Sequence, residues 1–131
     1  METGKIPPEL RYTKSHEWLR IAGTSVTVGI TDHAQSQLTD IVFVDLPAAG
    51  KAIAKGASAL VLESVKTVAD VYAPGAGTIA EANASLKAHP EHVNQDPYGK
   101  GWLFRLDLSG SLDETGLLSA DEYRAHVLAG G

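Results

Sequence analysis

The chain has 131 residues, of which 44% are hydrophobic, and a formal net charge of −5. This length predicts one domain with a core of its own, and the acidic balance argues against a nucleic-acid surface, which needs clustered basic residues. The lack of cysteine excludes disulfides and thiolate metal sites.

The hydropathy pattern argues against a membrane partner. The sequence contains no apolar run of about 18 residues, the length that predicts a membrane-spanning helix. Its opening residues lack the apolar core of a signal peptide and the Arg-rich pattern of a transit peptide. We therefore expect a cytoplasmic protein.

The first part of the chain predicts an arm followed by a hairpin. Proline and glycine in residues 1–11 favour an extended N-terminal arm, which leaves 12–131 as the single domain. Residues 18–22 and 25–30 are two short apolar runs separated by Gly23-Thr24, the pattern of a β-hairpin. Apolar and small or polar residues alternate in the second run, so one of its faces is expected to be buried.

A short helix and a strand are predicted next. Thr31-Asp32 has the chemistry of a helix N-cap, and Gln35 stands three residues beyond Asp32, where it could reach back to complete a capping box. We expect the helix over 33–38. Residues 41–46 form a dense β-forming run that ends before Pro47.

The stretch 58–72 is the least decided part of the chain. Propensity alone predicts one continuous strand there, yet a strand of about 15 residues is unusually long. The length favours a break without locating it, since the stretch has none of the Asn-Gly or Asp-Gly pairs typical of two-residue hairpin turns. Lys66 is the single cation in this stretch.

The remaining residues predict two more strands and helical segments. We expect strands over 78–82 and 102–108, with broken helical turns over 83–96 between them. Ser119 and Glu122 have the spacing of a capping box, which predicts a C-terminal helix. Short strands separated by glycine and proline indicate a small barrel or sandwich.

Lys66 has two interpretations. It is either a solvated lysine on an edge strand, where a charge opposes aggregation, or a covalently modified or nucleophilic lysine. A Schiff-base role is disfavoured, because the nearby carboxylates of Glu63 and Asp70 favour the protonated amine. From the residues alone, both interpretations stay open.

The sequence predicts no catalytic or metal site. His89 and His92 are three residues apart, but no further ligand pattern accompanies them, so we expect exposed loop histidines. No nucleophile elbow or phosphate-binding loop is present. Glu17 and Asp70 lie within predicted strands, and each is expected to face water unless other evidence assigns it a role.

Five blocks of this sequence together closely resemble the H-protein family of the glycine cleavage system. The resemblance runs from about Tyr12 to the C-terminus and implies a mainly β fold. That fold is a flattened β-barrel, or barrel-sandwich hybrid of the lipoyl/biotinyl type, with short peripheral helices and a C-terminal helix. The blocks that carry it are Tyr12–Trp18, Val28–Gln35, Asp40–Pro47, Glu63–Lys66 and Asn94–Trp102.

The resemblance implies that Lys66, at the tip of a β-hairpin, carries lipoic acid in amide linkage. The lipoyl-lysine arm then accepts an aminomethyl group after glycine decarboxylation, presents it for transfer to tetrahydrofolate, and is reoxidised. The implied partners are glycine decarboxylase (P protein), the aminomethyltransferase (T protein), dihydrolipoyl dehydrogenase (L protein) and a lipoate-attaching enzyme. The chain itself is expected to be a carrier and not an enzyme.

The resemblance also implies a surface cleft that shelters the loaded arm from water. Ser15, Glu17 and Asp70 match the polar residues of that cleft, and their oxygens would hydrogen-bond the cargo amine. Gln37 stands where some members have a bulky polar or basic residue along the arm's path. Thr39 replaces a frequent glycine. Glu63 matches a position read by the lipoate-attaching enzyme.

Three rival functions share the idea of a modified or exposed lysine. A lipoyl domain of a 2-oxoacid dehydrogenase complex would be shorter and would lack the block at 15–18 and the helical C-terminus. A biotin carrier would flank its lysine with methionines, whereas Val65 and Thr67 flank Lys66. The third class is a non-lipoylated interaction module or a donor of lipoyl groups to other proteins, and the donor role stays open as an additional one.

Overall fold

The fold is described from a computed structural model in which residues 4–131 are placed. Its strands are β1 (Arg11–Tyr12), β2 (Glu17–Ala22), β3 (Ser25–Ile30), β4 (Ile41–Asp45), β5 (Ala52–Ile53), β6 (Ser58–Ser64), β7 (Val68–Tyr72), β8 (Gly77–Ala82) and β9 (Phe104–Leu108). Its helices are α1 (Asp32–Leu38), the short 3-10 helix η1 (Ala84–Lys87), α2 (His92–Gln95) and α3 (Ala120–Leu128).

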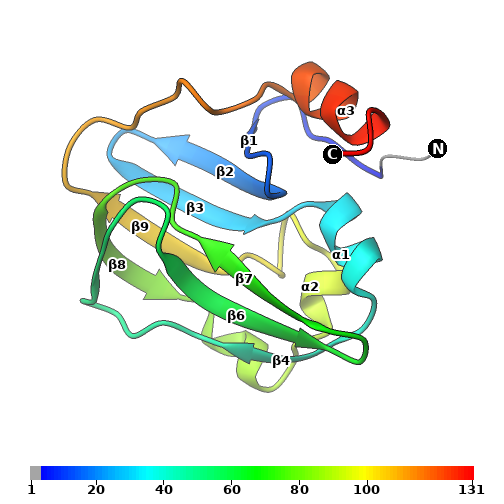
Figure 1. The fold of residues 1–131 in the computed structure, drawn as a ribbon. Coiled ribbons are helices and arrows are strands. Elements are labelled where there is room, and N and C mark those ends of the chain that lie inside the picture. The colour runs from blue at the N-terminus through cyan, green and yellow to red at the C-terminus, as the bar shows by residue number, and fades with distance from the viewer. Residues whose placement is uncertain (1–3) are drawn as a thin grey trace.

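Two antiparallel sheets face each other across the core, as Figure 1 shows. The larger sheet has the strand order β1-β2-β3-β9-β8-β5, and the smaller has the order β4-β6-β7. Helices α1 and α2 lie at one end, and α3 lies beside β1 (Figure 1). This confirms the mainly β, two-sheet architecture and the C-terminal helix that the sequence predicts.

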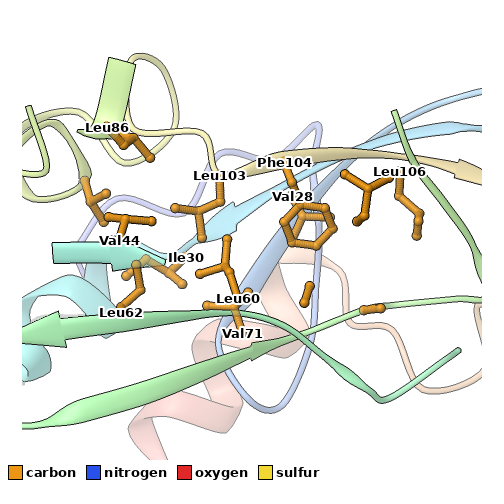
Figure 2. Packing of buried hydrophobic residues seen from close by; sticks show 14 of the residues in the cluster. Val28, Ile30, Val44, Leu60, Leu62, Val71, Leu86, Leu103, Phe104 and Leu106 are labelled. Atoms are coloured by element: carbon orange, nitrogen blue, oxygen red, sulfur yellow. The ribbon is translucent and has the colours of Figure 1, made fainter. Parts of the chain in front are cut away.

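The main core fills the space between the sheets. Val28 and Phe104 of the larger sheet point toward Leu60 and Val71 of the smaller one (Figure 2). A second, smaller cluster packs α3 against the N-terminal segment and includes Trp18. Burial of such side chains stabilises the fold by roughly 25 cal/mol per Å² of apolar surface removed from water.

The N-terminal segment packs onto α3. Ile6 and Leu10, which lie within the predicted arm, are buried in the second cluster with Tyr123 and Val127. Residues 1–3 of the predicted arm lie outside the described part of the chain. The boundary between an arm and the domain stays a prediction.

The predicted hairpin before α1 is confirmed. β2 and β3 pair from Glu17–Ile30 to Ala22–Ser25, with Gly23 at φ 64° in the turn. Val26, Val28 and Ile30 of β3 are buried, as the alternation in the sequence indicates.

Helix α1 begins as predicted but is capped differently. The Thr31 side chain accepts a hydrogen bond from the Ala34 backbone N–H, so Thr31 is the N-cap. The predicted reach of Gln35 back to the backbone is wrong, because its amide instead donates to the Asp32 carboxylate at 2.7 Å. The helix ends at Thr39, which has φ 64° and ψ −155°, a backbone conformation that favours glycine.

The stretch 58–72 is broken at residues 64–67, so the single strand that propensity alone favours is wrong. The Ser64 hydroxyl oxygen accepts hydrogen bonds from the backbone N–H groups of Lys66 (3.1 Å) and Thr67 (2.9 Å). The Ser64 N–H donates to the Thr67 carbonyl at 2.8 Å and closes the turn. A serine side chain thus replaces the Asn-Gly chemistry that the sequence lacks.

The C-terminal third follows the predictions with one correction. The broken helical turns are η1 and α2, and the Ser119–Glu122 capping box is present at the start of α3. The last strand starts at Phe104 and not at Trp102, whose side chain packs against the second cluster. Within residues 4–131, no helix has the length and apolar content needed to cross a membrane.

Candidate functional site

Lys66 lies in the turn between β6 and β7, and this turn projects beyond the ends of these two strands of the smaller sheet (Figure 1). Its side chain is exposed, and within residues 4–131 no hydrogen bond or ion pair engages its ammonium group. The neighbouring Val65 donates its backbone N–H to the Asp40 carbonyl at 3.0 Å, which ties the turn to the segment before β4. The amine is therefore held on a defined scaffold and is open to reaction.

The turn is bordered by apolar side chains that face solvent. Val65 is 68% exposed and Val68 is 59% exposed. Val68 lies opposite Glu63 in the strand register, and Glu63 lies opposite Phe43. Glu63, which is predicted to be recognised by the lipoate-attaching enzyme, is exposed between Phe43 and Val68.

Glu17 is the buried carboxylate of the site. Only 3% of its surface is exposed, so the expectation from propensity that it faces water is wrong. Its Oε1 accepts hydrogen bonds from Thr13 Oγ1 (2.5 Å) and Ser15 Oγ (2.6 Å), and its Oε2 accepts one from the Tyr72 backbone N–H at 3.3 Å. These donors compensate the cost of burying the charge.

A tight turn over residues 13–17 brings those donors together. Thr13 donates its N–H to the Glu17 carbonyl at 3.0 Å, and His16 donates its N–H to the Thr13 carbonyl at 3.1 Å. The short loop therefore places the hydroxyls of Thr13 and Ser15 around the carboxylate that follows them. Thr13 was not among the predicted site residues, although the signal for it is present in the sequence: two hydroxyl residues lie within four positions of an acid.

Asp70 is the second carboxylate and faces solvent, as the sequence predicts. It stands on β7 opposite Val61. The Ser58 hydroxyl donates to Asp70 Oδ1 at 2.7 Å, which leaves the other carboxylate oxygen without a hydrogen bond within residues 4–131. Asp70 is four residues from Lys66, and two of these steps lie in the turn, so the backbone distance between them is at most roughly 13 Å at about 3.3 Å per strand residue.

A cleft of about 190 Å³ brings the four predicted cleft residues together. We call it the Glu17 cleft. One wall is the 13–17 turn, a second is helix α1, and the third is formed by β6 and β7. Its lining residues are Ser15, His16, Glu17, Ile30, His33, Ala34, Gln37, Leu38, Leu62, Ala69, Asp70 and Val71.

The histidines of the Glu17 cleft were not identified from the sequence. His16 is half-buried, and burial together with the neighbouring His33 and His126 lowers the pKa of His16 from 6.5 to about 4. The ring is accordingly neutral at pH 7. The carboxyl groups of Glu17 and Asp70 line the same cleft as six apolar residues, and their oxygens offer hydrogen-bond acceptors for a small cation or amine.

The other pair of histidines gives no metal site. The His89 and His92 rings stack with their centroids 5.0 Å apart, and the His89 ring is 3.2 Å from Glu91. His92 lies within α2 and is partly buried, in contrast to the exposed loop position expected for it. Across the described part of the chain, no three His, Cys, Asp or Glu side chains cluster as metal ligands.

The geometry suits an acyl group on Lys66. The amine is accessible, the turn is rigidly hydrogen-bonded, and a cleft with an apolar floor opens along β7 from the same hairpin. Leu62 and Val71 supply apolar surface for a long chain, and Glu17 and Asp70 supply acceptors for a polar end. A flexible arm on Lys66 fits these residues.

Two facing antiparallel sheets with a lysine at the tip of a hairpin define a carrier protein of the lipoyl/biotinyl type. The chain belongs to the glycine cleavage H-protein family, whose profile matches residues 10–129.

Individual relatives agree with this assignment. The chain is 52% identical to a glycine cleavage system H protein of Rubrobacter xylanophilus, over 91% of this chain and 92% of the relative. It is 53% identical to one of Thermus thermophilus, over 91% and 93% respectively. A crystal structure of a glycine cleavage system H protein from Mycobacterium marinum matches with a TM-score of 0.85 and 41% identity, covering 93% of this chain and 98% of that one. The alternative of a 2-oxoacid dehydrogenase lipoyl domain is therefore not favoured.

Proposed function

We propose that Lys66 carries lipoic acid in amide linkage and that the chain uses this arm as the shuttle of a glycine cleavage system. The observation that carries the proposal is the position of Lys66, exposed in a rigid turn at the end of a strand that leads into the Glu17 cleft. When bound, the lipoyl group supplies a disulfide that accepts an aminomethyl group after glycine decarboxylation, delivers it for transfer to tetrahydrofolate, and is then reoxidised.

The residues of the chain hold and shelter the cargo. Glu17 is fixed by three hydrogen bonds, so its carboxylate needs little reorganisation to accept a further one from an amine. Asp70 supplies a second acceptor from the opposite wall of the cleft. Two carboxylates stabilise a protonated amine by charge-assisted hydrogen bonds, and the apolar lining limits the access of water.

The partners follow from the position of the arm. We propose that glycine decarboxylase, the aminomethyltransferase and dihydrolipoyl dehydrogenase each receive the Lys66 arm, and that a lipoate-attaching enzyme modifies it. The exposed Val65 and Val68 offer these enzymes an apolar contact around the lysine, and Glu63 offers a charge for recognition during attachment. The chain itself is a carrier without catalytic activity in this proposal. The cytoplasmic location stays a prediction.

Intact-mass measurement of the protein purified from its own cells tests the attachment site. We expect a gain of one lipoyl group that disappears in Lys66→Arg. Lys51→Arg is the matched control, because Lys51 is another exposed lysine close to a strand end, and this variant should keep the added mass. A wild-type chain that stays unmodified and still supports glycine cleavage would overturn the proposal.

A further inference from the structure

His16 has a left-handed backbone conformation, which is uncommon for residues other than glycine. Its φ is 73°, in the left-handed region where glycine and asparagine are preferred. The position is fixed on both sides, since the His16 N–H donates to the Thr13 carbonyl and its carbonyl accepts from the Thr31 N–H at 3.0 Å. The contacts of the His16 side chain show what this conformation positions.

The His16 ring is held by a single buried hydroxyl. Nδ1 of His16 is 2.7 Å from the Tyr123 hydroxyl, which is also 2.7 Å from Thr31 Oγ1. Tyr123 is fully buried on α3 and its ring stacks on Tyr12 with centroids 4.8 Å apart. The hydroxyl therefore cannot move far without disturbing the second core cluster.

This hydroxyl joins two walls of the Glu17 cleft. His16 directly precedes Glu17 and lies in the 13–17 turn, whereas Thr31 is the N-cap of α1, the helix that carries His33 and Gln37. The turn and the start of α1 are also joined by the backbone bond from the Thr31 N–H to the His16 carbonyl, and the Tyr123 hydroxyl adds a side-chain bond to each of them. The His16 ring is thereby held between the two walls, beside the buried carboxylate.

The charges around the His16 ring are consistent with this arrangement. The groups facing it are His33 from α1 and His126 and Tyr123 from α3. Burial, together with the neighbouring His33 and His126, lowers the pKa of His16 to about 4, so its ring is neutral at pH 7. A neutral ring in the wall does not repel an amine bound to Glu17.

We propose that His16 is a positioning residue of the Glu17 cleft, and that the Tyr123 hydroxyl fixes its ring so that the 13–17 turn and α1 enclose the cargo amine. This inference rests on the proposed function, because the cargo reaches the cleft on the Lys66 arm. It assigns to the C-terminal helix a part in protecting the cargo.

The test compares the lifetime of the aminomethyl-loaded protein in four lipoylated chains. These are wild type, Tyr123→Phe, His16→Asn and Tyr12→Phe. Tyr12→Phe is the matched control, since it removes another buried tyrosine hydroxyl, one that donates to the Pro7 carbonyl at 2.5 Å and does not touch the cleft. Decay of the loaded mass is followed by mass spectrometry without the aminomethyltransferase.

We expect Tyr123→Phe and His16→Asn to shorten the lifetime by about fivefold, the effect of losing one hydrogen bond, while Tyr12→Phe retains the wild-type value. An unchanged lifetime in His16→Asn overturns the inference, as does an equal loss in Tyr12→Phe. Should Tyr123→Phe fail to fold, as judged by its urea midpoint, His16→Asn decides the question, because asparagine tolerates the left-handed backbone.

A second readout needs no lipoyl group. Nitrogen-15 NMR of the unmodified chain should show the His16 ring as one fixed tautomer in wild type and in Tyr12→Phe, and as a tautomer mixture in Tyr123→Phe. A mixture already present in wild type would contradict the fixed ring. If instead the proposal that Lys66 is lipoylated is wrong, the intact mass of the wild-type protein will lack the lipoyl group, and this result is independent of the NMR spectra.

Discussion

The backbone N–H of Tyr72 donates to Oε2 of Glu17 at 3.3 Å and so connects the two sheets at the functional site. Glu17 begins β2 in the larger sheet, and Tyr72 ends β7 in the smaller one. Strand β7 begins two residues after Lys66, and its last residue donates a hydrogen bond to the carboxylate that is proposed to hold the cargo. The arm and its resting place are parts of one hydrogen-bonded unit.

Replacing Glu17 should shorten the lifetime of the loaded protein without preventing lipoylation. Glu17→Gln keeps the size of the side chain and removes its charge, which costs a charge-assisted hydrogen bond of about 1.5–3 kcal/mol. We expect the loaded form to decay roughly 10- to 100-fold faster, measured by intact mass. Glu9→Gln, at an exposed carboxylate outside the cleft, should decay like wild type. A wild-type lifetime in Glu17→Gln would remove Glu17 from the site.

Thr39→Gly should stabilise the fold. Thr39 has φ 64° and ψ −155°, a conformation almost restricted to glycine, in which a β-branched residue is strained. Glycine also adds entropy to the unfolded chain, which offsets part of the gain from relieving this strain. We therefore expect an increase of about 1 kcal/mol in the free energy of unfolding and of about 4 °C in Tm. Urea and thermal unfolding measure both.

Thr39→Ala separates backbone strain from the loss of the threonine hydroxyl, which donates to the Leu38 carbonyl. Alanine keeps the Cβ atom and should give no gain. Equal stability of the alanine and glycine variants would show that the strain at Thr39 is negligible.

The pKa of His16 predicts a loss of stability in acid. Its pKa is about 4 in the folded protein and 6.5 ordinarily, so the unfolded chain binds the additional proton between these values. Above pH 6.5 neither state holds this proton, so the lowered pKa has no effect on stability there; as the pH falls from 6.5 toward 4, protonation of the unfolded chain lowers the free energy of unfolding. Because the ring is only half-buried, we expect about 1–2 kcal/mol, less than the full shift implies.

Urea unfolding at pH 7.5 and pH 4.5 measures this contribution. His16→Asn cannot take up the proton, so it should lose about 1–2 kcal/mol less than wild type between the two pH values. Identical losses would show that His16 titrates alike in the folded and unfolded chains.

The local elements of the fold could be predicted because their causes are local. Alternation along β3 and the turn residues at Gly23-Thr24 are enough for the first hairpin, and the spacing of Ser119 and Glu122 is enough for the start of α3. The break at Lys66 was harder, because the turn depends on a serine hydroxyl that binds two backbone N–H groups, and no propensity scale reports that bond.

For the site, too, some features could be predicted from the sequence and others could not. The sequence alone identified Lys66 as the exceptional residue and predicted the size and the mainly β class of the domain. Its five matching blocks indicated the family. The burial of Glu17 and the part taken by Tyr123 were decided only by the tertiary structure. They depend on contacts between residues 55 and 107 positions apart, and such contacts exist only after two sheets and a helix have packed together.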